Sequence, residues 1–231
     1  RDLSSFPTRR SSDLTLPLCD VAWQCRRMSR RLQALIKHHA ELSACVRCPA
    51  MIGPVIIGAP ALSPIIQIGQ APGEREGKFG RPFAWTAGKT LFGWYRQIGV
   101  DEERFRERVY MAAVCRCFPG KNPKGGDRVP GTDEIANCAS WMSAEIELLR
   151  PRLIIPVGKL AIEQLMPVNR LKDVIGRRHA VAINGRPIDA IPLPHPSGAS
   201  TWHRVEPGKT LLQDALDLIA RHPAWAEVLH G

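Results

Sequence analysis

The sequence predicts an α/β fold in which helices cover both faces of a parallel sheet. Short apolar runs, typical of strands that are buried on both faces, recur at 65–69, 109–114, 153–157 and 190–193. Each run ends in a loop of glycine, proline or polar residues, and amphipathic stretches separate the runs. Strands that alternate with helices in this way form a parallel sheet between two helical layers.

The amphipathic stretches between the strands have the 3.6-residue period of helices. Apolar residues from Ala22 to Leu42 follow this period and are interleaved with arginines, so the first predicted helix covers residues 15–44. A proline at 151 ends the longest of the later helices. The later helices are predicted near 87–98, from 132 to 150, at 159–166 and at about 208–221.

A β-hairpin is predicted shortly before the last strand. Asn184 and Gly185 form a dipeptide that favours a two-residue turn, and Val181–Ile183 and Ile188 flank it with apolar residues. This hairpin is not counted among the strands of the parallel sheet, which is therefore predicted to have four strands.

Composition favours a single globular domain that binds a polyanion. The chain has 231 residues, of which 44% are hydrophobic and 23% charged, which is enough for a sizeable core. No apolar run approaches the ~20 residues that span a bilayer, so we expect no membrane partner. A net charge of +10 and a pI near 9.7 suggest nucleic acid as the partner, although a solvated cationic surface is the alternative.

The cysteine count argues against a disulfide framework. The chain has 7 cysteines, which is an odd number, and no secretory signal is visible. We therefore expect a cytoplasmic protein whose thiols are free or bound to a metal.

Residues 1–14 are expected to be an assembly artefact and not a part of the domain. The stretch from Ser5 to Leu14 looks like the translation of a sequencing adapter, and the chain does not begin with Met. We exclude these residues as one would exclude a tag, and assign 15–231 to a single domain.

Two loops that follow predicted strands carry residues expected of a ligand site. The sequence GQAPG, Gly69–Gly73, follows the first strand, and GRPF, Gly80–Phe83, then presents an aromatic ring beside a rigid proline. The last strand ends in His195–Pro196–Ser197. Because ligands bind at the carboxyl ends of parallel strands, we expect these loops to face one another. Taken alone, a histidine at a strand end is more often a structural hydrogen-bonding residue than a catalyst.

The order of GQAPG, GRPF and HPS resembles the motifs of the uracil-DNA glycosylase superfamily. It looks most like the iron–sulfur bacterial and archaeal branch, families 4 and 5. The resemblance implies a three-layer α/β/α sandwich around a central four-stranded parallel sheet. It also implies a monofunctional DNA repair glycosylase that hydrolyses the N-glycosidic bond of uracil, or of a related deaminated base, after base flipping. The implied partner is uracil-containing DNA, single- or double-stranded, and we expect a monomer.

The resemblance also implies a role for each motif residue. His195 would stabilise negative charge on the pyrimidine O2, Gln70 would be the second catalytic position, and Phe83 would stack on the base. The other substrate-binding residues implied are Gly69, Ala71, Pro72, Gly73 and Ser197. Phosphate contacts are expected from Gly88, Lys89 and Ser200, and from Lys121, Lys124 and Arg128 of the polar loop 119–131.

Several cysteines have a spacing that suits a metal or a cluster. Cys45 and Cys48 form a CxxC, and thiolates at such spacings bind zinc or iron–sulfur clusters. The resemblance implies a structural 4Fe–4S cluster, with zinc as the alternative. It completes the ligand set with Cys117 and Cys138, and Cys115 remains a competing candidate for Cys117. Cys19 and Cys25 are expected to be spare.

Two positions depart from the family pattern. The family has Glu where this chain has Gln70, and an amide cannot take a proton from water; Glu74 or Glu76 could replace it. The family also has Asn, which reads the pyrimidine edge, where this chain has Ala113. Losing such a hydrogen-bond partner relaxes base discrimination.

These departures leave other functions open. The first alternative is a catalytically weak or inactive protein of the same fold that binds lesions or single-stranded DNA. A zinc-stabilised nucleic-acid module unrelated to base excision is the second, and the ordered motifs disfavour it.

Overall fold

The computed structural model describes residues 18–198 and 200–230, and side chains from residue 30 onward. The predictions about residues 1–14 and about the thiols of Cys19 and Cys25 therefore lie outside the described part. The elements are α1 (Leu18–Ser43), β1 (Ile65–Gly69), α2 (Glu76–Phe79), α3 (Thr86–Gln97), α4 (Glu102–Arg108), β2 (Tyr110–Ala113), α5 (Thr132–Leu149), β3 (Leu153–Pro156), α6 (Lys159–Glu163), η1 (Leu171–Asp173), β4 (His179–Ile183), β5 (Arg186–Ala190), η2 (Trp202–Arg204), α7 (Gly208–Ala220) and α8 (Pro223–His230).

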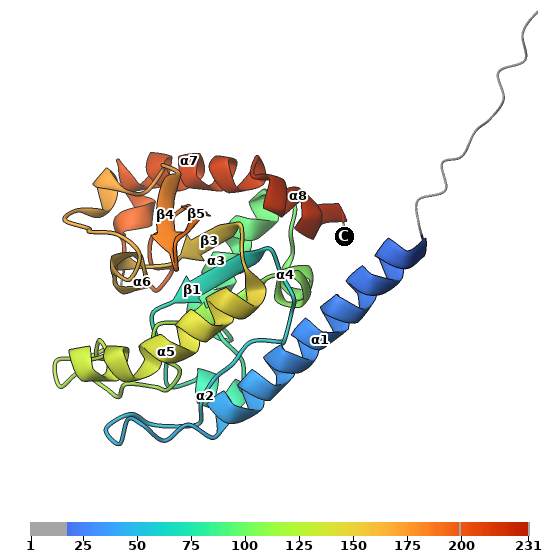
Figure 1. Cartoon of the computed structure of the whole chain (residues 1–231). Coiled ribbons are helices and arrows are strands. Elements are labelled where there is room, and N and C mark those ends of the chain that lie inside the picture. Colours follow the sequence, from blue (N-terminus) through green and yellow to red (C-terminus); the bar gives the residue numbers. More distant parts are fainter. Residues whose placement is uncertain (1–17, 199, 231) are drawn as a thin grey trace, which may run out of the picture.

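The sheet has five strands in the order β2-β1-β3-β5-β4 (Figure 1). Strand β1 pairs in parallel with β2 and β3, and β3 pairs in parallel with β5. The prediction of a parallel α/β sheet is thus confirmed. The four strands β2, β1, β3 and β5 form the predicted parallel sheet, and the hairpin at Asn184–Gly185 adds a fifth strand to it: β4 pairs with β5 in antiparallel fashion. Both turn residues have positive φ, 52° and 73°, as such a tight turn requires.

The last parallel strand begins earlier than the sequence predicts. The expected strand at 190–193 corresponds to β5, which starts at Arg186, plus an extension in which Leu193 forms a bridge with Val157. The polar Arg186 and Asp189 hide this start, because β5 is itself one strand of the hairpin and is only partly buried. The extension carries the chain to His195 at the carboxyl edge of the sheet.

Two apolar clusters lie on opposite faces of the sheet. Strand β1 is buried along its whole length, and its Ile65 belongs to one cluster while Ile66 and Ile68 belong to the other. Residues of α3, α4, α7 and α8 complete the first cluster, and residues of α1 and α5 complete the second. Figure 1 shows α1 and α5 on one side of the sheet, which gives the predicted three-layer sandwich.

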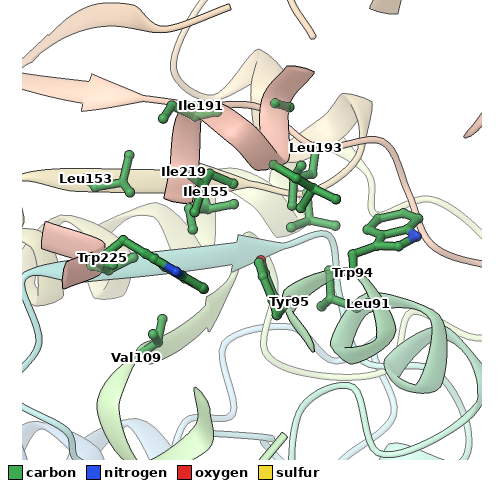
Figure 2. Packing of buried hydrophobic residues seen from close by; sticks show 14 of the residues in the cluster. Leu91, Trp94, Tyr95, Val109, Leu153, Ile155, Ile191, Leu193, Ile219 and Trp225 are labelled. Atoms are coloured by element: carbon green, nitrogen blue, oxygen red, sulfur yellow. The ribbon is translucent and has the colours of Figure 1, made fainter. Parts of the chain in front are cut away.

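Large aromatic side chains, among them Trp94, Tyr95 and Trp225, pack with aliphatic ones in the first cluster (Figure 2). Tyr95 stacks on Phe105 with ring centroids 4.1 Å apart, and Trp225 of the last helix packs against both rings. The indole N–H of Trp225 donates to the carbonyl of Ile98 at 3.1 Å, so its polar atom is satisfied. Full burial of such large rings contributes several kcal/mol and holds α3 against the sheet. None of the described helices is both long and apolar enough to cross a membrane.

Candidate active site

A cleft of about 810 Å³ opens at the carboxyl edge of the sheet. It is lined by the loop after β1, by the turn before α3, by the end of β2 and by the segment after β5. This is the edge at which parallel α/β sheets bind ligands. The structure places most of the predicted site in this one cleft, namely Gly69, Gln70, Ala71, Pro72, Gly73, Phe83, His195, Ser197 and Ser200.

The loop after β1 is tied down through its backbone. The amides of Val114 and Cys115 donate to the carbonyls of Gly69 and Gln70, at 2.9 and 3.1 Å. On the other side, the buried carboxylate of Glu76 accepts the amide N–H of Gly73 at 2.9 Å. These bonds fix the loop between β2 and α2, so its geometry does not depend on a bound ligand.

The two glutamates considered as replacements for the family base have different surroundings. Glu76 lines the cleft and is occupied by the Gly73 amide, so it supports the loop. Glu74 is exposed and forms an ion pair of 3.1 Å with Lys121 across the cleft mouth. The hydrogen bond and charge of Lys121 lower the pKa of Glu74 below its ordinary value of 4.5. A carboxylate of lowered basicity is a poor candidate for a general base.

Phe83 is held against the end of β1 by contacts to its backbone and ring. Its φ is +51°, and the guanidinium of Arg106 donates to the carbonyls of Pro82 and Phe83, at 2.8 and 3.1 Å. A Cβ on Gly69 would lie 2.9 Å from the Phe83 ring, and one on Gly88 would lie 1.8 Å from the Phe83 carbonyl oxygen. Both glycines therefore make room for this residue.

Gly88 and Lys89, two of the predicted phosphate contacts, do not line the cleft. Gly88 is buried against Phe83, whereas Lys89 is exposed in the first turn of α3. Their contact with phosphate stays a prediction. The structure gives Gly88 the further task of seating Phe83.

His195 is a neutral imidazole whose proton position is fixed by its neighbour. The amide N–H of Ser197 donates to Nδ1 of His195 at 3.3 Å, so Nδ1 must be the unprotonated nitrogen and Nε2 carries the proton. Burial lowers the pKa of His195 below its ordinary value of 6.5, which keeps the ring neutral at pH 7. The ring rests on Gly158, where a Cβ would lie 2.9 Å from Cδ2.

Gln70 and Ala113, the two positions that depart from the family pattern, both line the cleft. The end of β2 therefore offers a methyl group at the place where the family has an amide. Any discrimination between bases at this wall must come from shape and from backbone groups.

Cationic residues of the loop 119–131 lie at the cleft mouth and are already paired with carboxylates. Lys121 bonds Asp127 at 2.8 Å in addition to Glu74, and Arg128 bonds Glu134 at 2.7 Å. Lys121 and Arg128 line the cleft, and Lys124 lies outside its lining. A phosphate would have to replace these carboxylates, so the predicted phosphate role of the loop stays a prediction.

Two supporting residues, Arg106 and Gly158, were missed by sequence reasoning. Arg106 lies on α4, and no local pattern distinguishes it from the other charges of that helix. Gly158 follows β3 directly and has a φ of +88°. A glycine at the end of a predicted strand is the one signal that could have pointed to a close contact.

Comparison with known proteins identifies the family. The family model "Uracil DNA glycosylase superfamily" matches residues 56–219. A type-4 uracil-DNA glycosylase of Thermotoga maritima is 32% identical over 167 residues, which are 68% of this chain and 78% of that protein. The chain belongs to the uracil-DNA glycosylase superfamily.

Other members of the superfamily align over similar regions. A type-4 enzyme of Saccharolobus solfataricus is 33% identical over 58% of this chain and 61% of its own length. A type-5 uracil-DNA glycosylase of Pyrobaculum aerophilum is 24% identical over 71% of this chain and 73% of that protein. Likeness to both types supports the assignment to the family 4/5-like branch. The superfamily match includes both cleft loops and begins after the CxxC of residues 45–48.

The described cysteine side chains, Cys45, Cys48, Cys115, Cys117 and Cys138, are all free thiols, and we call them the cysteine group. Backbone bonds between Ile52 and Phe118, 2.8 and 2.9 Å long, join the segment after the CxxC to the segment of Cys117. Across the described residues, no set of three or more His, Cys, Asp or Glu side chains has the arrangement of a metal site.

The thiols of the cysteine group nevertheless influence one another. Cys115 donates to Cys138 and thereby lowers the pKa of Cys138 to about 6, helped by the amide and charge of Arg116. Burial, followed by the charges of Cys138, Cys45 and Cys48, raises the pKa of Cys117 to about 11. Thiols this close together are a suitable donor set for a soft metal or a cluster.

A buried polar network lies behind the cysteine group. Glu145 of α5 is fully buried and accepts from Arg116 and from the hydroxyl of Tyr110, with His38 of α1 3.4 Å away. Burial alone would raise the pKa of Glu145, but the Arg116 charge and these hydrogen bonds outweigh burial and lower it. The network joins α1, β2 and α5 around the residue between Cys115 and Cys117.

Proposed function

We infer that this chain is a DNA repair glycosylase that hydrolyses the N-glycosidic bond between uracil and deoxyribose in DNA. The observation that supports this most is the shared cleft, which both Phe83 and His195 line although more than a hundred residues separate them. Superfamily membership and the names of the type-4 relatives point to the same reaction.

The chain's own residues suggest how the reaction proceeds. Uracil reaches the cleft only after leaving the helical stack, or from a single strand. Phe83 stacks on the base, and the backbone of Ala71 and Pro72 borders it. The bond to C1′ breaks as the uracil leaves with negative charge on O2, and Nε2–H of His195 donates to that oxygen.

The water that attacks the sugar needs orientation more than deprotonation. As C1′ becomes cationic, it reacts with a neutral water molecule, which releases its proton afterwards. The amide of Gln70 can hold such a water by hydrogen bonds although it cannot accept the proton. This route accounts for a cleft with Gln where the family has Glu.

Contacts to the DNA backbone are assigned to the cleft rim. Ser197 and Ser200 border the cleft and follow the catalytic histidine, so they suit the phosphates beside the extruded nucleotide. The start of α3, at Gly88 and Lys89, adds the positive end of a helix dipole. The loop 119–131 adds the positively charged side chains of Lys121, Lys124 and Arg128. We propose a cytoplasmic monomer that accepts uracil in single- or double-stranded DNA.

We propose that Cys45, Cys48, Cys117 and Cys138 hold a 4Fe–4S cluster, with zinc as the alternative. Cys117 is preferred over Cys115 because its sequence context resembles that of the family cysteine, and Cys115, which donates to Cys138, is the competing candidate. Such a cluster would be structural and would connect the end of α1 to α5. Iron and sulfide analysis, together with a broad visible absorption, separates a cluster from zinc.

Release of free uracil from a single-stranded oligonucleotide with one uracil tests the proposed activity. The expected result is free uracil and an abasic product, with no release of thymine from the matched thymine oligonucleotide. Binding of the uracil strand without release would contradict the enzyme and favour the alternative function, a lesion- or single-strand-binding protein, which Gln70 and Ala113 suggest.

A further inference from the structure

Two large aromatic side chains are left exposed beside the cleft. Phe79 ends α2 with 49% of its surface exposed, and Trp85 precedes α3 with 42% exposed. Their rings stack, with centroids 5.8 Å apart and an interplanar angle of 20°. The guanidinium of Arg75 lies over the Trp85 ring, 5.0 Å from its centroid. An ordered but exposed aromatic stack of this kind marks an interaction surface.

This aromatic stack is continuous with the cleft. Trp85 and Arg75 line the cleft together with Phe83, and Trp85 follows Phe83 by two residues in the chain. The contacts of Phe83 with Arg106 and Gly88 also restrict the position of Trp85, because only one residue separates Trp85 from Phe83. A nucleotide chain that delivers one base to Phe83 must pass close to Trp85.

The charge around the stack suits a nucleic acid. Arg75, Lys78 and Arg81 are exposed on the segment that joins the cleft loop to Phe83. Arg81 makes only a long contact of 3.9 Å with Glu102, and both side chains are substantially exposed. Aromatic rings interleaved with cations are the usual surface for unpaired bases, since a ring accepts any base and the cations hold its phosphate.

We propose that Trp85, supported by Phe79 and Arg75, is a stacking platform for the base next to the extruded uracil. This inference rests on the proposed function and makes unpaired DNA the preferred substrate class. A neighbouring base in a duplex is already stacked on both faces, whereas a base in a single strand is free to stack elsewhere. On Trp85 it takes the place of the Arg75 guanidinium over the ring, and the Arg75 charge then lies beside the phosphate. The protein therefore discriminates in favour of uracil in single-stranded or locally unpaired DNA.

The test compares oligonucleotides that differ in the neighbouring base alone. The probes are a single-stranded uracil oligonucleotide, two versions in which the 5′ or the 3′ neighbour is an abasic analogue, and the duplex. The wild-type protein is expected to lose about tenfold in affinity when one of the two neighbours lacks its base, within the range of one base–aromatic stack. Binding and single-turnover uracil release are measured for each probe.

The variants Trp85→Leu and Trp85→Phe separate stacking from mere apolar contact. Trp85→Leu is expected to bind the intact and the abasic-neighbour strands equally, and to lose about tenfold in its preference for single strand over duplex. Trp85→Phe is expected to retain most of both effects. Val205→Ala, an exposed apolar residue outside the cleft lining, is the matched control and should behave as wild type. Thermal melting shows whether each variant is folded.

The platform and the enzyme can fail separately. If the wild type releases uracil but neither abasic neighbour weakens binding, the platform is wrong and the glycosylase stands. The same conclusion follows if Trp85→Leu still binds the intact strand more tightly than the abasic-neighbour strands by the wild-type factor. If no uracil is released but Trp85→Leu abolishes the dependence on the neighbouring base, the platform stands and the proposed reaction is wrong.

Discussion

The cleft and the cysteine group hold their functional side chains by different means. In the cleft, Phe83 and His195 are positioned by hydrogen bonds that involve backbone groups. Glycines at 69, 88 and 158 leave room for these two residues. Around the cysteine group, the segments are held together by a fully buried network of charged side chains centred on Glu145. The first arrangement is sensitive to added volume, and the second to lost charge.

The largest effect is expected from removing the charge at the centre of the buried network. Glu145→Gln leaves the buried Arg116 without its counter-charge, and we expect a loss of about 3–5 kcal/mol in the free energy of unfolding. Glu147→Gln, on the same helix but paired at the surface with Arg186, should cost about 0–1 kcal/mol. Denaturant titration of both variants makes the comparison. Equal losses would show that the network does not support α5.

The next effect concerns the cleft and catalysis alone. His195→Ala removes the N–H that we propose donates to the pyrimidine oxygen, and we expect a decrease of roughly 10²–10³ in the single-turnover rate with the fold intact. His230→Ala, an exposed histidine at the end of α8, is the control and should leave the rate unchanged. A His195→Ala rate within a factor of two of wild type would remove His195 from the mechanism.

A smaller effect should follow from one added methyl group. Gly158→Ala pushes a Cβ to 2.9 Å from the His195 ring, and displacing that ring should slow release roughly 10- to 100-fold. Gly185→Ala has a similar positive φ but nothing within 4 Å, so it should incur the backbone strain of about 1–2 kcal/mol without affecting the rate. If both variants keep wild-type rates, Gly158 does not position the histidine.

The smallest effect is a pH dependence. Because burial lowers the pKa of His195, the ring takes up a proton only below 6.5, and protonated Nδ1 then repels the Ser197 amide. The rate should therefore fall toward acid with a midpoint below 6.5, and His195→Gln should lack this decline. The free energy of unfolding depends on pH in the same direction. The contribution of neutral His195 to stability is complete above pH 6.5 and declines as the pH falls toward the pKa of His195 in the folded state. An acid decline that persists in His195→Gln would assign it to another group.

The two regions also differ in how far the sequence predicted them. The motif order placed Phe83 and His195 in one cleft, because the carboxyl ends of neighbouring parallel strands meet at one edge. Arg106 and Gly158 could not be predicted, because each matters through a contact with a segment remote in the chain: Arg106 with Phe83, and Gly158 with His195. The fifth strand was predicted as a hairpin but not as a part of the sheet.

The cysteine group was harder to predict than the cleft. The spacing suggested which cysteines could bind a cluster. It could not distinguish Cys115 from Cys117, which lie two positions apart on a segment without regular secondary structure. Nor did any pattern indicate that Glu145 would be buried, since it occupies an ordinary position in an amphipathic helix and its partners come from α1 and β2.

The central claim, that the loop after β1 and the histidine after β5 act as one site, is tested most directly by a double-mutant cycle. The cycle combines Phe83→Leu with His195→Ala and measures single-turnover uracil release. If Phe83 holds the base against His195, removing the histidine should cost clearly less once Phe83 is gone, so the double variant is faster than the product of the single effects. Strictly multiplicative losses would show that the two residues do not act together, and would contradict the account.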